Sequence, residues 1–198
     1  LFANNNSLSE ITALPSSISG GAMTLLATQT ASGSANLSFT SGIDSTYDSY
    51  VFKFINIHPA TDSVNFYVNF SVDGGSNYNV TKTTTWFYAY HNESGSTSSL
   101  EYNAGLDLAQ STANQPLMEN IGNDNDQSGS GFMTLYNPSS TTFVKHFIAT
   151  TQDVIHINYT ENAFISGYAN TTSAINAVQF VMESGNIDSG VIKLYGVS

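Results

Sequence analysis

Short runs in which apolar residues alternate with polar ones recur along most of the chain. The segment 64–71 is the clearest case: Val64, Phe66, Val68 and Phe70 alternate with Asn, Tyr, Asn and Ser. Side chains two positions apart lie on the same face of a β-strand, so this pattern predicts a strand with one buried face. Clusters of Gly, Asn, Asp and Ser separate the runs, as is typical of turns between strands.

About ten strands are expected by this criterion, and almost no helix. They share β-branched and aromatic residues, and they cover residues 24–29, 36–40, 50–57, 64–72, 83–90, 131–137, 143–150, 163–169, 174–182 and 190–197. The segment 100–108 is ambiguous between a helical turn and a loop, and the polar segment 120–131 is expected to be a surface loop. No repeat of fixed period is visible, which argues against a propeller or a solenoid. The sequence therefore predicts an all-β fold, an antiparallel two-sheet β-sandwich of jelly-roll type.

Residues 1–21 differ from the rest of the chain. They are rich in Asn and Ser, hold isolated apolar residues and end in Gly-Gly. We interpret them as a short N-terminal arm or linker, with the sandwich domain covering residues 22–198. Leu1 is expected to be a truncation, a processing site or a residue within a longer chain.

The charge balance excludes two classes of partner. The chain has 4 Lys+Arg against 15 Asp+Glu, a formal net charge of −11. Binding to nucleic acid or to an anionic lipid surface requires a basic patch, so neither partner is expected. The longest apolar runs fall far short of the roughly 20 residues of a membrane span. With 40% hydrophobic residues the chain can nevertheless build a core.

Many of the acids stand in turn-like surroundings. Asp44, Asp48, Asp62, Asp73 and Asp188 each lie among Gly, Ser, Thr or Asn residues. Aspartate in such a context commonly accepts hydrogen bonds from nearby backbone N–H groups. We therefore expect the negative charge to be concentrated in the loops, and contacts between copies to be made by uncharged strand faces.

The segment SVDGGSNY, residues 71–78, has the spacing of an Asp-box, with Ser71, Asp73 and Gly75 in register. The aspartate of such a motif accepts backbone hydrogen bonds while glycine supplies a positive φ, which predicts a structural turn closing a hairpin. A single copy does not indicate a sialidase-type propeller.

A second acidic segment resembles the first half of a calcium loop. Asp124 and Asp126 are followed by Ser128 and Gly129, but Leu135 stands where an EF-hand has its bidentate Glu. The EF-hand interpretation therefore fails. A looser Ca²⁺ site at Asp124 and Asp126 stays open beside the alternative of a solvated acidic loop.

The aromatic run WFYAYH, residues 86–91, carries the most suggestive side chains. In a strand, Trp86, Tyr88 and Tyr90 share one face and Phe87 points to the other. One set is expected to pack in the core. The other could stack on a sugar, so Trp86, Tyr88, Tyr90 and His91 are candidate carbohydrate-binding residues.

No motif indicates an enzyme. The chain has no cysteine and no G-x-S-x-G sequence. Glycoside hydrolysis needs two carboxylates facing each other across a cleft, and the spacing of the acids singles out no pair. We expect no catalytic residues.

Three segments resemble a family of virion structural domains of tailed bacteriophages, marine phages in particular. They are residues 40–78, with "YD-x-Y", "NIHPATD" and "S-x-D-G-G", residues 135–149, with an "NPSS" turn, and residues 175–198, with "SGNIDSG" before "LYG". The likeness extends over nearly everything from Leu25 to the C-terminus.

The resemblance implies a jelly-roll-like domain on the exterior of a virion, without a catalytic residue set. It leads us to expect a tail-fibre or appendage domain that forms a homo-oligomer, with a trimer favoured, and that contacts other virion proteins and the host surface, including a host glycan. A capsid decoration protein is the first alternative, and a free carbohydrate-binding module is the second.

Overall fold

The computed structural model describes residues 23–198, and over that range it contains strands and no helix. The all-β expectation is confirmed for this part of the chain. The expected arm at residues 1–21 lies outside the described residues. No helix in residues 23–198 could cross a membrane. The strands are β1 (Thr24–Ser34), β2 (Leu37–Phe39), β3 (Ser49–Pro59), β4 (Val64–Ser71), β5 (Lys82–Asn92), β6 (Ser98–Tyr102), β7 (Gln115–Ile121), β8 (Gly129–Tyr136), β9 (Lys145–Ile155), β10 (Tyr159–Ala169), β11 (Ala177–Met182) and β12 (Ile187–Val197).

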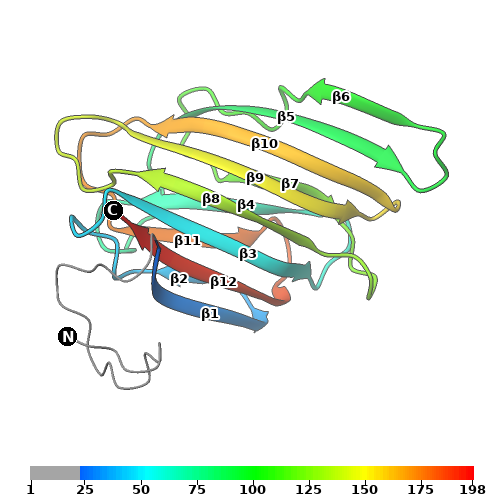
Figure 1. The fold of residues 1–198 in the computed structure, drawn as a ribbon, viewed down its shortest axis with the longest axis horizontal. Coiled ribbons are helices and arrows are strands. Elements are labelled where there is room, and N and C mark those ends of the chain that lie inside the picture. The colour runs from blue at the N-terminus through cyan, green and yellow to red at the C-terminus, as the bar shows by residue number, and fades with distance from the viewer. Residues whose placement is uncertain (1–22) are drawn as a thin grey trace, which may run out of the picture.

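All strand pairs are antiparallel, and all twelve strands belong to one hydrogen-bonded sheet. The order is β1-β12-β3-β8-β9-β7-β4-β11-β2, and β10, β5 and β6 continue outward from β9 (Figure 1). The path starts at β1 and ends at β2, where the Gln29 amide donates a hydrogen bond of 2.5 Å to the Ser38 carbonyl. The sheet is therefore nearly closed and barrel-like, and a jelly-roll sandwich of two separate sheets is not confirmed.

The core lies between the strands at the front of Figure 1 and those behind them. Phe180 on β11 contacts Phe52 and Phe54 on β3, with ring centroids 5.3 and 5.2 Å apart, and stacks on Phe66 of β4 at 5.8 Å. All four side chains are buried. Burial of each contributes roughly 1.5–3 kcal/mol, so this cluster fixes the two layers against each other.

A bulge in β3 keeps two apolar residues on the buried face. Asn56 has a φ of 50°, and the register with β8 shifts between Phe54 and Ile57. The extra residue places both Phe54 and Ile57 inside, although they are three positions apart. On the neighbouring β12, Gly190 lies against the bulge with a φ of 123°.

The alternation pattern predicts ten of the twelve strands and misses β6 and β7. Strand β7 holds Pro116 and ends in the polar residues Glu119 and Asn120, so it lacks the expected alternation. The ambiguous segment 100–108 contains the end of β6 followed by turns. The expected surface loop at 120–131 is shorter than predicted, because both of its ends belong to strands and Gln127 in its middle is buried.

Candidate functional site

Strand β5 separates the four candidate sugar-binding residues. Trp86, Tyr88 and Tyr90 face the inside of the fold, whereas His91 points outward with Phe87. Trp86 is fully buried. The four residues therefore do not form one platform. Trp86 packs in the core, His91 lies on the opposite face beside a separate pocket, and the two tyrosines line a pocket on the inner face.

The inner aromatic residues form a row that continues from β5 onto β10. Ring centroids are 4.8 Å apart for Trp86 and Tyr88, 5.6 Å for Tyr88 and Tyr90, and 5.9 Å for Tyr90 and Tyr159. The last two pairs are stacked. Such contacts add to the burial energy and hold each ring in place, so the tyrosines are a rigid wall.

This wall lines a pocket of about 280 Å³ between the inner face of the sheet and the end of β7. None of the described residues that line the pocket is basic. Its lining combines tyrosine and isoleucine side chains with smaller hydrogen-bonding groups. The lining residues are Tyr88, Tyr90, Thr97, Glu119, Asn120, Ile155, Ile157, Tyr159 and Glu161.

Two carboxyl groups are buried side by side on β9 and β10, and one of them, that of Glu161, lines this pocket. Glu161 on β10 lies directly opposite Asp153 on β9 in the antiparallel register, and their side chains are 2% and 1% exposed. Residues so placed have Cβ atoms about 4.5–5.5 Å apart. Both Asp153 carboxylate oxygens and Glu161 Oε1 have no hydrogen-bond partner among the described residues. Glu161 lines the pocket, and Asp153 is its buried cross-strand neighbour.

Burial without a basic partner favours the protonated form of these acids. Desolvation, and then the charges of Asp153 and Glu119, raise the pKa of Glu161 to about 9. Desolvation and Glu119 raise the pKa of Asp153 well above its ordinary value. The pKa of Glu119 is also raised by its burial. At pH 7 Glu161 is therefore a neutral carboxylic acid, which can both donate and accept a hydrogen bond.

The carboxylate of Glu101 is the hydrogen-bond partner of the two tyrosine hydroxyl groups. Tyr90 donates a hydrogen bond of 3.2 Å to Glu101 on β6, and Tyr88 lies 3.5 Å from the same carboxylate. Desolvation and the nearby charges of Glu119, Glu101 and Glu161 raise the pKa of Tyr88 to about 12. Both hydroxyl groups remain protonated at neutral pH, so the pocket offers phenol and carboxyl groups as hydrogen-bonding partners.

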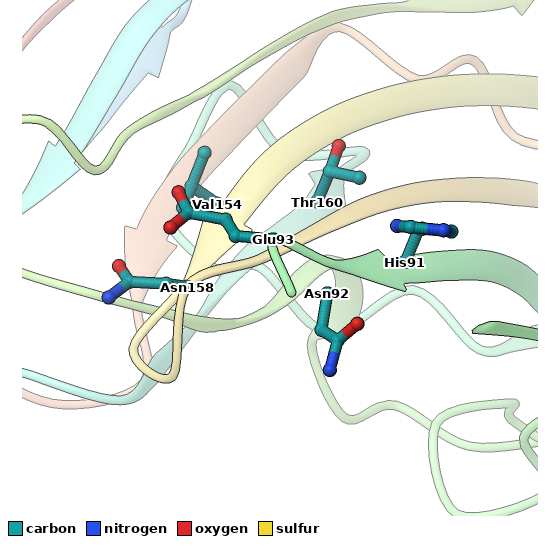
Figure 2. A pocket seen from close by; sticks show the side chains of 6 residues that line it. All are labelled: His91, Asn92, Glu93, Val154, Asn158 and Thr160. Carbon is teal, nitrogen blue, oxygen red and sulfur yellow. The ribbon is translucent and has the colours of Figure 1, made fainter. Parts of the chain in front are cut away.

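A second pocket, of about 230 Å³, lies beside His91 on the other side of the sheet. Its lining residues come from the end of β5 and from the β9–β10 hairpin (Figure 2). The side chains of His91, Asn92 and Thr160 point in different directions and do not converge on one point (Figure 2).

The candidate calcium residues lie on an exposed turn. The Asp124 carbonyl accepts a hydrogen bond from Gln127 N–H at 2.9 Å and lies 3.3 Å from His58 Nε2. Both Asp124 and Asp126 are exposed. No three His, Cys, Asp or Glu side chains within residues 23–198 are grouped so that they could hold a metal ion. The turn is organised by buried Gln127, whose side-chain carbonyl accepts from Asp124 N–H at 3.2 Å.

Around Asp73 the chain forms a hydrogen-bonded turn. Its carboxylate accepts from Asn77 N–H at 2.9 Å, from the Asn77 amide at 2.7 Å and from Ser71 Oγ–H at 2.6 Å. Gly75, with a φ of 91°, donates its N–H to Ser71 Oγ at 3.0 Å. The turn does not close a hairpin, because β4 pairs with β7 and β11 and not with β5.

The opposite surface of the same strands, which we call the outer face, is uncharged and rich in aromatic residues. Phe87 on β5 and Phe164 on β10 stack at 5.1 Å, and they are 40% and 37% exposed. Tyr102 on β6 lies opposite Phe87, and Phe132 on β8 continues the row beyond Thr150 of β9. The outward positions of β5, β10, β9 and β8 include no Asp, Glu, Lys or Arg.

Sequence reasoning misses the acids of the inner pocket. The polar residues around Asp153 and Glu161 interrupt the apolar pattern, so the pattern ends one strand at residue 150 and begins the next at 163, whereas β9 and β10 extend to residues 155 and 159. Asn158 lies in the tight turn between these strands, with a φ of 60°. Asparagine favours such turns, so this residue is the sequence signal that could have predicted the pairing of β9 with β10. Comparison of the chain with protein-family models, with curated protein sequences and with solved structures gave no match.

Proposed function

We propose that this chain is a non-enzymatic structural protein on the exterior of a tailed-phage virion. In this proposal it is a tail-fibre or appendage domain that assembles as a homo-oligomer, with a trimer favoured, and contacts the host surface. The observation that carries the proposal is the uncharged aromatic outer face. The assignment of the chain to a phage virion is supported by the resemblance to phage virion domains of residues 40–78, 135–149 and 175–198.

The outer face has the composition of a subunit contact. Aromatic residues are enriched and charged residues depleted in the centres of protein interfaces. A net charge of −11 makes association through charged surfaces costly, since copies repel one another. Phe87, Phe164, Phe132 and Tyr102 provide a surface on which that repulsion is smallest.

The size of this face also suits a second copy of the chain. Three of its four strands have 11 residues and β8 has 8. With strands about 4.8 Å apart, the face measures up to about 36 Å along the strands and roughly 15–19 Å across them. The resulting area of roughly 500–600 Å² approaches the roughly 800 Å² per partner of a stable interface. Exposed Leu100 and Tyr102 on β6 extend the face further.

We also propose that the fold is best understood as a jelly-roll-type sandwich whose two layers remain joined at one point. Strands β7 and β9 share a single residue pair, Ile121 and Ile155. The contacts of Phe180 and Phe66 with Phe54 of β3 support two layers packed face to face. Rigid sandwiches of this type are common in particle proteins.

The mass of the full chain in solution tests the oligomer. Native mass spectrometry is expected to give a trimer for the wild type and a monomer for Phe164→Asp, because the substitution places a charge in the contact. Val72→Asp is the control: Val72 is also exposed, but it lies in the turn after β4, away from the outer face, so this variant should stay trimeric. A monomeric wild type, or a trimer that survives Phe164→Asp, contradicts the proposed contact.

A further inference from the structure

We propose that the inner pocket bounded by Tyr88, Tyr90, Tyr159, Glu119 and Glu161 binds one uncharged sugar unit of a larger glycan. The inference deepens the proposed function, because it rests on the assignment of this chain to a surface that contacts the host. It names the chemical class of ligand and the side chains that hold it. The pocket beside His91 lacks the tyrosine wall and the buried acid.

An unpartnered buried group points to a ligand. Glu161 is 2% exposed, lines the pocket, and has no hydrogen-bond partner for Oε1. Leaving such an oxygen unpaired costs about 1–3 kcal/mol, which a ligand hydroxyl group at this position would recover. A buried polar group without a partner in an otherwise well-packed sheet is a feature that calls for an explanation.

The charge of the site selects against anionic ligands. Two acids, Glu119 and Glu161, line the pocket, and the described residues that line it include no base. A uronic acid, a sialic acid or a phosphate would bring a negative charge into this buried, acid-lined site without a cation to pair with it. An uncharged hydroxyl-bearing ligand meets no such penalty.

The size and lining of the pocket suit one sugar ring. A volume of about 280 Å³ is just below the roughly 300–1,000 Å³ of pockets for drug-sized ligands. Ile155, Ile157 and the tyrosine row offer apolar surface to the C–H face of a sugar. Thr97, Asn120 and the carboxyl groups offer donors and acceptors to its hydroxyl groups.

Glu161 acts in this site as a neutral hydrogen-bonding group, and this makes a conservative substitution informative. A glutamine has the same shape and also donates and accepts, so Glu161→Gln should retain binding. A leucine is apolar and makes no hydrogen bond, so Glu161→Leu should weaken binding about tenfold or more. A role that is only structural would not separate the two variants in this direction.

The test is binding of the full chain to a printed array of bacterial surface oligosaccharides, followed by calorimetry with the tightest binder. We expect neutral glycans to bind to wild type, to Glu161→Gln and to the control His91→Ala, whose side chain lies on the opposite face of β5. Glu161→Leu and Tyr90→Leu should lose about tenfold or more in affinity while keeping the wild-type circular dichroism spectrum.

Each other outcome overturns a defined part of the inference. If the oligomeric wild type binds no glycan, the sugar site is wrong and the oligomer proposal stands. If only amino sugars bind, and N-acetylation abolishes their binding, the uncharged ligand is wrong. If the bound oligosaccharide is cleaved by wild type and not by Glu161→Gln, the site binds sugar but the chain is an enzyme, which contradicts the proposed function.

Discussion

Asp153 and Glu161 lie directly opposite each other on β9 and β10, with both side chains buried and no basic partner in the described chain. Like charges placed opposite each other in a sheet destabilise it, so the pair is retained in its protonated form. A third acid, Glu119 on β7, is close enough that its charge raises the pKa of both carboxyl groups.

This pair makes stability depend on pH. Glu161 has a pKa of about 9 in the folded chain against an ordinary value of 4.5, so between these values the folded state holds a proton that the unfolded state has released. Stability therefore falls as pH rises, by up to about 1.4 kcal/mol per pH unit for one group. The raised pKa of Asp153 acts in the same direction.

The melting temperature should accordingly be higher at pH 5.5 than at pH 8.5. Glu161→Gln cannot ionise and should show a clearly smaller difference between the two values. A melting temperature that rises over this interval would show that the pair is not protonated in the folded chain.

The Phe180 ring is the centre of the core, and its removal should be costly. Four phenylalanine rings surround it, and its side chain is fully buried. Phe180→Ala should lower the free energy of unfolding by about 3–5 kcal/mol, measured by urea denaturation. Phe143→Ala is the matched control, because Phe143 is 70% exposed and should lose well under 1 kcal/mol. Equal losses would mean that the layers do not pack as described.

Two glycines with positive φ should differ in their response to alanine. At Gly190 a Cβ atom would lie 2.7 Å from the Asn56 carbonyl oxygen and 2.9 Å from Ile57 Cα, whereas at Gly33 nothing lies within 4 Å. Gly33→Ala should cost only the conformational penalty, about 1–2 kcal/mol. Gly190→Ala adds a backbone clash at the β3 bulge and should lower the melting temperature further. Similar melting temperatures for the two variants would argue against the bulge.

The Asp73 turn should stabilise the fold through its hydrogen bonds. The carboxylate accepts three of them, and these interactions lower its pKa to about 2. Asp73→Ala should lower the melting temperature, while Asp126→Ala on the exposed turn should leave it nearly unchanged. Thermal unfolding at pH 7 measures both, and an unchanged Asp73→Ala would exclude a structural role.

The strands are mostly predictable from the sequence because one of their faces is apolar. The placement of Trp86 and Tyr88 on one face of β5 and of Phe87 on the other follows from alternation alone. Strand β7 is not predictable in this way, because Pro116 and Glu119 interrupt its pattern and its burial depends on strands distant in the chain.

The candidate site is less predictable than the fold. Alternation identifies Tyr88 and Tyr90, but the pairing of Asp153 with Glu161 depends on the register of a hairpin. The expectation that the acids belong to loops holds for Asp73, which accepts hydrogen bonds within its turn, and fails for the buried pair. A buried ionisable group without a local partner has no signature in the composition.

The most direct test of the proposed function is to look for this protein in a reconstruction of a tailed-phage particle. We predict symmetric density for the domain on a tail fibre or another tail appendage, with the outer face of β5, β10, β9 and β8 against neighbouring copies and the inner pocket open to solvent. Density on the capsid lattice would contradict this account and identify the chain as a decoration protein.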